Sequence, residues 1–226
     1  MINENHSYIE KEISAACEKH NINRSKINLV AVSKYNPVSS IIEAYEDGLI
    51  HFGESRAQEL KDKAEQISLD IQWHFIGHLQ TNKVKIVVEN SDFIHSVDSI
   101  KLAAEIQKRA ANIDKIQNIF IEVKTSGEDS KFGVSEFKDA YELADYCTEA
   151  KNIEVIGLMT MAPYTDDEKV IRNCFSTLRN LKDQLNKKNS SITELSMGMT
   201  NDFKIAIEEG ATYLRIGSAI FGERNY

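Results

Sequence analysis

Leu195-Ser-Met-Gly-Met-Thr-Asn-Asp202 and, shortly behind it, Arg215-Ile-Gly-Ser-Ala-Ile-Phe-Gly222 follow one plan. Each stretch begins with apolar residues, breaks into small residues and resumes as a helix or turn. This pattern is typical of a buried strand that ends in a loop close to a ligand, because Gly198 and Gly217 let the backbone approach without a Cβ. Backbone N–H groups at a helix start favour an anion, most often phosphate. The alternative interpretation is two ordinary strand-to-helix turns.

Hydroxyl side chains accompany both stretches. Ser196, Thr200 and Ser218 add hydroxyl donors to the backbone N–H groups. Thr200 is also a suitable N-cap for a helix over residues 201–209, and Gly210 is placed to end that helix.

The same alternation of strand and helix extends back through the chain. Short β-branched runs end in small or polar residues, and helical spacing of apolar residues follows. The predicted strands are residues 27–32, 49–52, 71–76, 93–97, 119–123, 154–158 and the segments around Leu195 and Leu214. The predicted helices are residues 5–20, 38–47, 55–66, 81–89, 100–111, 135–150, 166–187 and 201–209.

Regular alternation implies a parallel sheet, and eight strands indicate a closed barrel. The expected fold class is α/β: a single (β/α)8 TIM barrel over residues 1–226, one domain with an extra N-terminal helix. An open, doubly wound sheet is the alternative. The absence of a Gly-x-Gly-x-x-Gly motif after the first predicted strand counts against it.

Composition excludes several classes of protein. A net charge of −8 over 226 residues argues against a nucleic-acid-binding protein, which needs a basic face. The polar start of the chain has no apolar signal core, and no apolar run is long enough to span a bilayer. The three widely spaced cysteines, Cys17, Cys147 and Cys174, form no disulfide framework. We therefore expect a cytoplasmic protein with reduced cysteines and no membrane contact.

Lys34 is the first candidate for chemistry. The active face of a (β/α)8 barrel lies at the carboxyl ends of the strands, and Lys34 directly follows the first predicted strand. A lysine that is partly desolvated there has a lowered pKa, and its amine is a nucleophile for an aldehyde. The alternative is a lysine whose stem snorkels at the barrel rim.

The lysine and the phosphate-binding pattern together define a ligand. An aldehyde at one end and a phosphate at the other describe pyridoxal 5′-phosphate (PLP). Arg215 precedes Gly217 by two residues, so alternation turns both toward the barrel interior. Its guanidinium can meet the pyridine nitrogen, keep it unprotonated and weaken the ring as an electron sink. The alternative for Arg215 is an ion pair with a barrel carboxylate such as Glu54 or Glu122.

A metal site is not expected. His74 and His78 are four residues apart but straddle a strand end, and no Glu-x-x-His motif accompanies them, which argues against zinc. Glu89, Glu122 and the pair Glu128-Asp129 are possible acid–base groups, although no pattern singles out a tuned pair.

An ordered set of motifs resembles the pyridoxal phosphate homeostasis protein family over nearly the whole chain. The motifs are Ala31-Val-Ser-Lys34 with Pro37, Phe52-Gly-Glu54 with Gln58-Glu59, Trp73-His-Phe-Ile-Gly-His-Leu-Gln80 with Asn82-Lys83, Ser126-Gly-Glu128 with Lys131 and Gly133, Gly157-Leu-Met159, Leu195-Ser-Met-Gly-Met199 with Asp202, and Arg215-Ile-Gly217 with Ile220-Phe-Gly222.

The resemblance implies a barrel like the N-terminal domain of alanine racemase, with PLP held as a Schiff base on Lys34. It also implies that Arg215 faces the pyridine ring. The residues that it assigns to the phosphate are Ser196, the following backbone of Met197 and Gly198, and the pair Gly217 and Ser218. Two departures from the family pattern, Ser55-Arg56 and Lys124, bear on contacts around the ring.

The resemblance further implies a carrier or regulator of intracellular PLP that has no established catalytic turnover and no catalytic residues. We expect PLP as its small-molecule partner, apo PLP-dependent enzymes as possible recipients, and a monomer. An amino-acid racemase-like enzyme with weak activity is the alternative, but a racemase needs two bases and Lys34 supplies one. Tyr164 is a second base in principle, although we expect it to pack against the rim. A retro-aldol enzyme or a lysine aldolase of the same fold are further alternatives.

Overall fold

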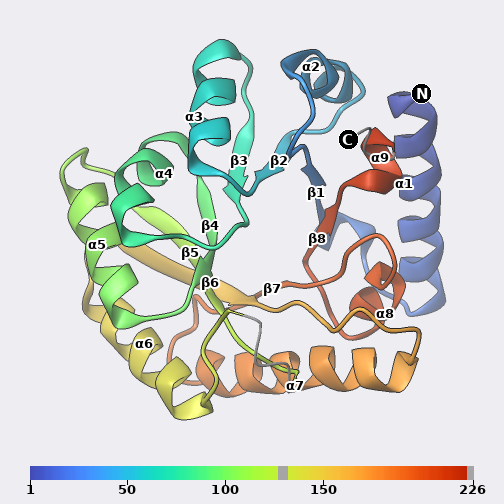
Figure 1. The fold of residues 1–226 in the computed structure, drawn as a ribbon. Helices are drawn as coiled ribbons and strands as arrows, with labels where there is room; N and C mark the ends of the chain where they lie inside the picture. The colour runs from blue at the N-terminus through green and yellow to red at the C-terminus, as the bar shows by residue number, and fades with distance from the viewer. Residues whose placement is uncertain (127–131, 223–226) are drawn as a thin grey trace.

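The computed structural model describes residues 1–126 and 132–222, and within them eight parallel strands close into one barrel in the order β1 to β8 (Figure 1). The motif residues Gly127, Glu128, Asp129 and Lys131 lie outside the described residues. The strands are β1 (Asn28–Val32), β2 (His51–Glu54), β3 (Gln72–Phe75), β4 (Phe93–Val97), β5 (Gln117–Glu122), β6 (Ile153–Met159), β7 (Glu194–Ser196) and β8 (Tyr213–Ile216).

Helices surround the barrel, and each strand is followed by at least one helix before the next strand or the end of the described chain (Figure 1). The helices are α1 (Ile2–Lys19), η1 (Arg24–Lys26), α2 (Val38–Glu46), α3 (Ala57–Gln66), η2 (Thr81–Lys83), α4 (Val84–Asn90), α5 (Ile100–Ala111), α6 (Phe137–Glu149), α7 (Glu168–Asn186), α8 (Phe203–Glu208) and α9 (Ser218–Phe221).

Two apolar regions hold the fold together. The larger one lies between the outer faces of the strands and the helices, where Phe175 and Leu178 of α7 are fully buried. A small cluster fills the barrel interior, and it contains Val30, Phe120 and Tyr213. The predicted (β/α)8 barrel is therefore confirmed, because alternate strand residues supply both layers.

The N-terminal helix α1 covers the side of the barrel where β8 pairs with β1. It packs against α2, α8 and α9, and Ile9 and Ile13 are its buried contacts. The Asn5 side chain donates a hydrogen bond to the Ile220 carbonyl of α9 over 2.9 Å. The extra N-terminal helix expected from the sequence thus fastens the last helix of the described chain to the barrel.

Helices α2 and α5 begin where the sequence predicts, whereas several other helix starts differ by two or three residues. The predicted cap Thr200 is wrong: α8 begins after Asp202, whose Oδ1 accepts the Met199 N–H over 2.5 Å. This hydrogen bond closes a turn over residues 199–202, so residues 201 and 202, which were expected to be helical, precede the helix. Helix α5 is capped by Ser99, whose side chain accepts the Leu102 N–H. Gly210 follows α8 with φ of +90°, as a helix-ending glycine requires.

Candidate functional site

A cavity of about 520 Å³ opens at the carboxyl ends of the strands. Its walls come from segments that follow β1, β3, β6, β7 and β8, together with the first turns of α7 and α8. Four of the residues predicted from the sequence meet in it: Lys34, Arg215, Gly217 and Ser218. The fold therefore brings the predicted lysine and arginine to one enclosed space.

The backbone on both sides of Lys34 is held by Lys63 of α3 and two glutamates. The Lys63 ammonium is buried, and it donates to the Ser33 carbonyl over 2.9 Å and to Glu54 and Glu59 over 2.7 Å each. Glu59 in turn accepts the Tyr35 backbone N–H over 2.6 Å. The residues before and after Lys34 are thus both fixed by one network.

Glu54 lies at the centre of this network. Its carboxylate is fully buried, and it accepts the Ser33 hydroxyl over 2.6 Å as well as Lys63. Burial raises the pKa of Glu54, although the charge of Lys63 and its hydrogen bond act in the opposite direction. Tyr35 has φ of 66°, a left-handed conformation that a tyrosine adopts only where its surroundings impose it.

Arg215 lines the cavity and is only 5% exposed. Its guanidinium donates to the Ser196 hydroxyl and, over 2.9 Å, to the Thr160 carbonyl. Burial lowers the pKa of Arg215 to about 10, while the charges of Asp202 and Glu122 raise it, so the side chain is a cation at neutral pH. Of the carboxylates suggested for it, Glu54 pairs instead with Lys63.

Gly217 and Ser218 close the cavity on the β8 side. A Cβ added at Gly217 would lie 3.3 Å from both the Cβ and the carbonyl oxygen of Val32, which is tighter than ordinary contacts. Glycine at position 217 therefore avoids a close contact with Val32 and keeps this part of the cavity wall, where β1 and β8 meet, free of a side chain. Ser218 and Thr200 contribute hydroxyl groups to the same cavity. Together with Lys34 and Arg215, they give the site cationic and hydroxyl groups, which suit an anionic ligand.

The three predicted residues of β7 and its turn lie behind this surface. Met197 is fully buried, and Gly198 has φ of +95°, with no room for a Cβ beside Ala206 of α8. The Ser196 hydroxyl is fully buried and bonded to Arg215 and, over 2.8 Å, to His95. Residues 199–202 line the cavity in their place, so the phosphate contacts assigned to Ser196, Met197 and Gly198 stay predictions.

A row of histidines in the barrel interior was missed by the sequence analysis. The rings of His51, His74 and His95 lie on the neighbouring strands β2, β3 and β4 and are hydrogen-bonded in series. One signal was present in the sequence: each of three consecutive strands carries a histidine. His78, which was paired with His74 for a zinc site, instead stacks on Phe132 at 3.8 Å between ring centroids.

Glu122 is the most perturbed carboxyl group at the barrel mouth. Burial raises its pKa to about 7, and the nearby charge of Asp98 adds to the shift, while Arg215 and Lys124 act against it. Glu122 therefore changes protonation near neutral pH. The sequence named it only as one of several possible acid–base groups.

Arg56, one of the departures from the family motifs, contacts Tyr35, the residue that follows Lys34. The guanidinium of Arg56 is 4.8 Å from the centroid of the Tyr35 ring, a cation–π contact. Tyr164 does not pack against the rim as expected, because it is 94% exposed. Tyr164 and its loop, residues 161–166, nevertheless line the cavity.

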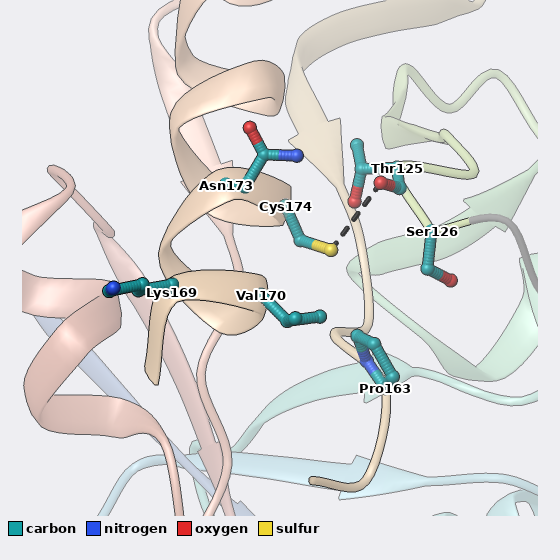
Figure 2. A pocket seen from close by; sticks show the side chains of 7 residues that line it. All are labelled: Thr125, Ser126, Pro163, Lys169, Val170, Asn173 and Cys174. Atoms are coloured by element: carbon teal, nitrogen blue, oxygen red, sulfur yellow. Dashed lines mark hydrogen bonds between the residues drawn. The ribbon is translucent and has the colours of Figure 1, made fainter. Parts of the chain in front are cut away.

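A second pocket of about 350 Å³ lies between the ends of β5 and β6 and helix α7 (Figure 2). Figure 2 shows Cys174 of α7 directed at the Thr125 carbonyl, to which its thiol donates over 3.4 Å. The pocket contains none of the predicted site residues. Within the described residues, no group of three potential ligands is arranged to hold a metal ion, and no helix has the length and apolarity to cross a membrane.

The chain is similar to proteins of known name along its whole length. The family model of the alanine racemase N-terminal domain matches residues 15–225. A pyridoxal phosphate homeostasis protein of Aquifex aeolicus is 45% identical over 222 residues, which cover 97% of this chain and 97% of that protein. A protein of the same name from Vibrio cholerae is 39% identical over 231 residues, covering 100% and 97%.

Solved structures agree with this similarity. PipY of Synechococcus elongatus with PLP bound has a TM-score of 0.88 and 31% identity, and the match covers 98% of this chain and 100% of that chain. An alanine racemase of Clostridium difficile has a TM-score of 0.75 at 12% identity, covering 96% of this chain and 57% of that chain. The second similarity shows a shared fold.

Proposed function

This chain is a member of the pyridoxal phosphate homeostasis protein family, and on that premise we propose that it binds PLP in the cavity at the barrel mouth, with Lys34 as the covalent anchor. The observation that carries the proposal is the meeting of Lys34 and Arg215 in one cavity whose remaining walls offer Gly217, Ser218 and Thr200. An amine and an anion-binding surface are the two features that an aldehyde with a phosphate group requires.

Each residue has a role that follows from its chemistry. Bound PLP supplies an aldehyde that reacts reversibly with amines. Lys34 is the residue that would hold PLP, its amine condensing with the aldehyde as water is lost, and the Lys63 network fixes the backbone around Lys34. Ser218, Thr200 and the backbone at Gly217 bind the phosphate. Ser196, Met197 and Gly198 support this surface from behind, and the Ser196 hydroxyl holds Arg215.

Arg215 also bears on whether the protein is an enzyme. A guanidinium can donate a hydrogen bond to the ring nitrogen but keeps its own proton and cannot accept a bond from a protonated ring, so it favours the unprotonated ring nitrogen and leaves the ring a weak electron sink. The second base that a racemase needs has no good candidate in Tyr164, whose side chain extends into solvent. We therefore propose a PLP carrier or regulator without robust turnover, rather than a racemase-like enzyme.

We also propose a compartment, an oligomeric state and recipients of the cofactor for this protein. Cys17, Cys147 and Cys174 are buried thiols outside any disulfide, which suits a reducing compartment, and we place the protein in the cytoplasm. We propose that it acts as a monomer of 25.6 kDa, and that apo PLP-dependent enzymes receive the cofactor from it. Sedimentation equilibrium tests the mass, and PLP transfer to an apo-enzyme in the presence of a PLP trap tests direct delivery.

An absorption spectrum before and after borohydride reduction tests the anchor. The protein incubated with PLP should show an imine band that bleaches on reduction, and peptide mapping should find the pyridoxyl mass on the peptide containing Lys34. Lys34→Ala should lose the reducible adduct, whereas Lys124→Ala, a second lysine near the barrel mouth, should keep it. A wild-type protein that takes up no PLP would overturn the proposed function.

A further inference from the structure

A continuous line of hydrogen bonds crosses the barrel interior from β2 to β8. The Nδ1 of His51 lies 3.0 Å from Nε2 of His74, and the Nδ1 of His74 lies 2.9 Å from Nε2 of His95. The Nδ1 of His95 is 2.8 Å from the Ser196 hydroxyl, which accepts a hydrogen bond from Arg215. We call His51, His74, His95 and Ser196 the histidine relay. It ends on the cation that faces the cavity.

The direction of these bonds follows from the donors available. Arg215 can only donate, so the Ser196 oxygen accepts from it. A hydroxyl oxygen can accept a second bond, so the direction depends on where the single hydroxyl proton of Ser196 points, and we assign that proton to the bond with the Nδ1 of His95. His95 must carry its own proton on Nε2, which donates to His74, and the same reasoning gives His74 a proton on Nε2. With the Ser196 proton on the bond to His95, the whole relay has one tautomer.

Packing alone does not explain why these positions carry histidine. His74 and His95 are fully buried, and burial holds the pKa of each ring well below its ordinary value, so both are neutral. Their rings stack on Phe93 and Phe120, at centroid distances of 4.4 Å and 4.2 Å. An apolar ring would make the same stacks and would need no hydrogen-bond partners. The nitrogen atoms are therefore the part of these side chains that requires an explanation.

We propose that His95 and His74 are positioning residues for Arg215. His95 draws the Ser196 proton away from Arg215 and leaves the Ser196 lone pairs directed at the guanidinium. His74 keeps the acceptor nitrogen of His95 on the Ser196 side, because it occupies the opposite nitrogen. The consequence for PLP rests on the proposed function, in which Arg215 faces the cofactor ring.

The first test uses the protein without cofactor. Nitrogen-15 NMR of the imidazole rings distinguishes the two neutral tautomers and the cation. We expect His74 and His95 to be neutral between pH 6 and pH 8, each with its proton on Nε2. A proton on the Nδ1 of His95 would overturn the proposed direction and with it the positioning role. This result does not depend on whether the protein binds PLP.

The second test separates hydrogen bonding from packing. His95→Asn retains an acceptor near the position of Nδ1, whereas His95→Phe keeps the ring and loses both nitrogens. The positioning role predicts about tenfold weaker PLP binding for the Phe variant, about 1.4 kcal/mol, and a smaller loss for the Asn variant. It also predicts a shifted absorption maximum of bound PLP in the Phe variant. His20→Gln, on the outside of the barrel, should match the wild type.

The outcomes separate the two proposals. A Phe variant that binds PLP as tightly as the wild type, with an unchanged spectrum, would overturn the positioning role. So would an Asn variant that is weaker than the Phe variant, because packing would then dominate. If the Phe variant does not fold, as circular dichroism shows, the tautomer measurement decides. A wild-type protein that binds no PLP would overturn the proposed function and leave the tautomer result valid.

Discussion

Glu122 shows at the scale of a single residue how burial ties stability to pH. Its pKa in the folded protein is raised to about 7 from 4.5, chiefly by burial. A group with a raised pKa binds its proton more tightly in the folded state, so its contribution to stability falls as pH rises between these two values. The wild-type protein without cofactor should therefore lose free energy of unfolding in this window.

Glu122→Gln should remove that dependence. At pH 8 the free energy of unfolding of the variant should exceed that of the wild type by on the order of 1–2 kcal/mol. At pH 5 this difference should shrink toward zero. Urea unfolding at both pH values measures it. Glu89→Gln, an exposed position on α4, is the control and should show no such trend. A difference for Glu122→Gln that is the same at both pH values would contradict the explanation.

Lys63 is the second residue whose removal has a defined result. Lys63→Met leaves the buried Glu54 carboxylate without its cation, and breaking a buried pair costs about 3–5 kcal/mol. Lys61→Met on the same helix removes only an exposed pair with Glu65 and should cost less than about 1 kcal/mol. Urea denaturation compares them. Adding Glu54→Gln to Lys63→Met should recover part of the loss, and equal costs for the two lysines would refute the assignment.

The residues of the site were predictable to different degrees. Lys34, Arg215, Gly217 and Ser218 followed from their places at strand ends, because alternation and strand order fix where such side chains gather. The bond from Ser196 to His95 joins residues 101 positions apart and crosses the barrel. Alternation says that both side chains point inward, but not which of several inward groups they meet.

At the scale of elements, the strands lie where the sequence pattern predicts them, but several helices begin at other residues than predicted. A strand is set by a run of apolar residues, which the sequence displays directly. A helix start depends on which of several neighbouring polar side chains turns back to bond the backbone. At α8 the Asp202 carboxylate accepts the Met199 N–H, which lies before the helix, and the helix starts after Asp202 with no side-chain cap. That choice is made by the loop geometry at the barrel mouth.

The turn from β7 to α8 gives a prediction at this scale. A Cβ at Gly198 would lie 2.6 Å from the Cβ of Ala206, and φ there is +95°. Gly48 has φ of +98° with open space around it. Gly198→Ala should therefore cost about 2–4 kcal/mol, from strain plus overpacking, and Gly48→Ala about 1–2 kcal/mol from strain alone. Chemical denaturation of both variants checks this, and equal costs would show that α8 yields to the added methyl group.

At the scale of the whole molecule, the barrel closes by pairing its first strand with its last, so unfolding should be one event. Ile13→Ala in α1 removes a fully buried side chain and should cost about 2–5 kcal/mol. Trp73, the single tryptophan, lies on β3. The unfolding midpoint followed by its fluorescence should shift by the same amount as the midpoint followed by far-ultraviolet circular dichroism. Tyr8→Ala, on the exposed face of the same helix, should change stability by less than about 0.5 kcal/mol. Separate transitions for the two signals would show that α1 unfolds on its own.

The closed sheet has a consequence for how the protein behaves at high concentration. Each of the eight strands described is bonded to a neighbour on both sides, so the folded barrel presents no row of unused backbone amides. Such rows are the templates on which other chains add as strands in aggregates and amyloid. A crowded cell can therefore accumulate the folded protein without strand-to-strand recruitment, and aggregation has to begin from molecules that have already opened.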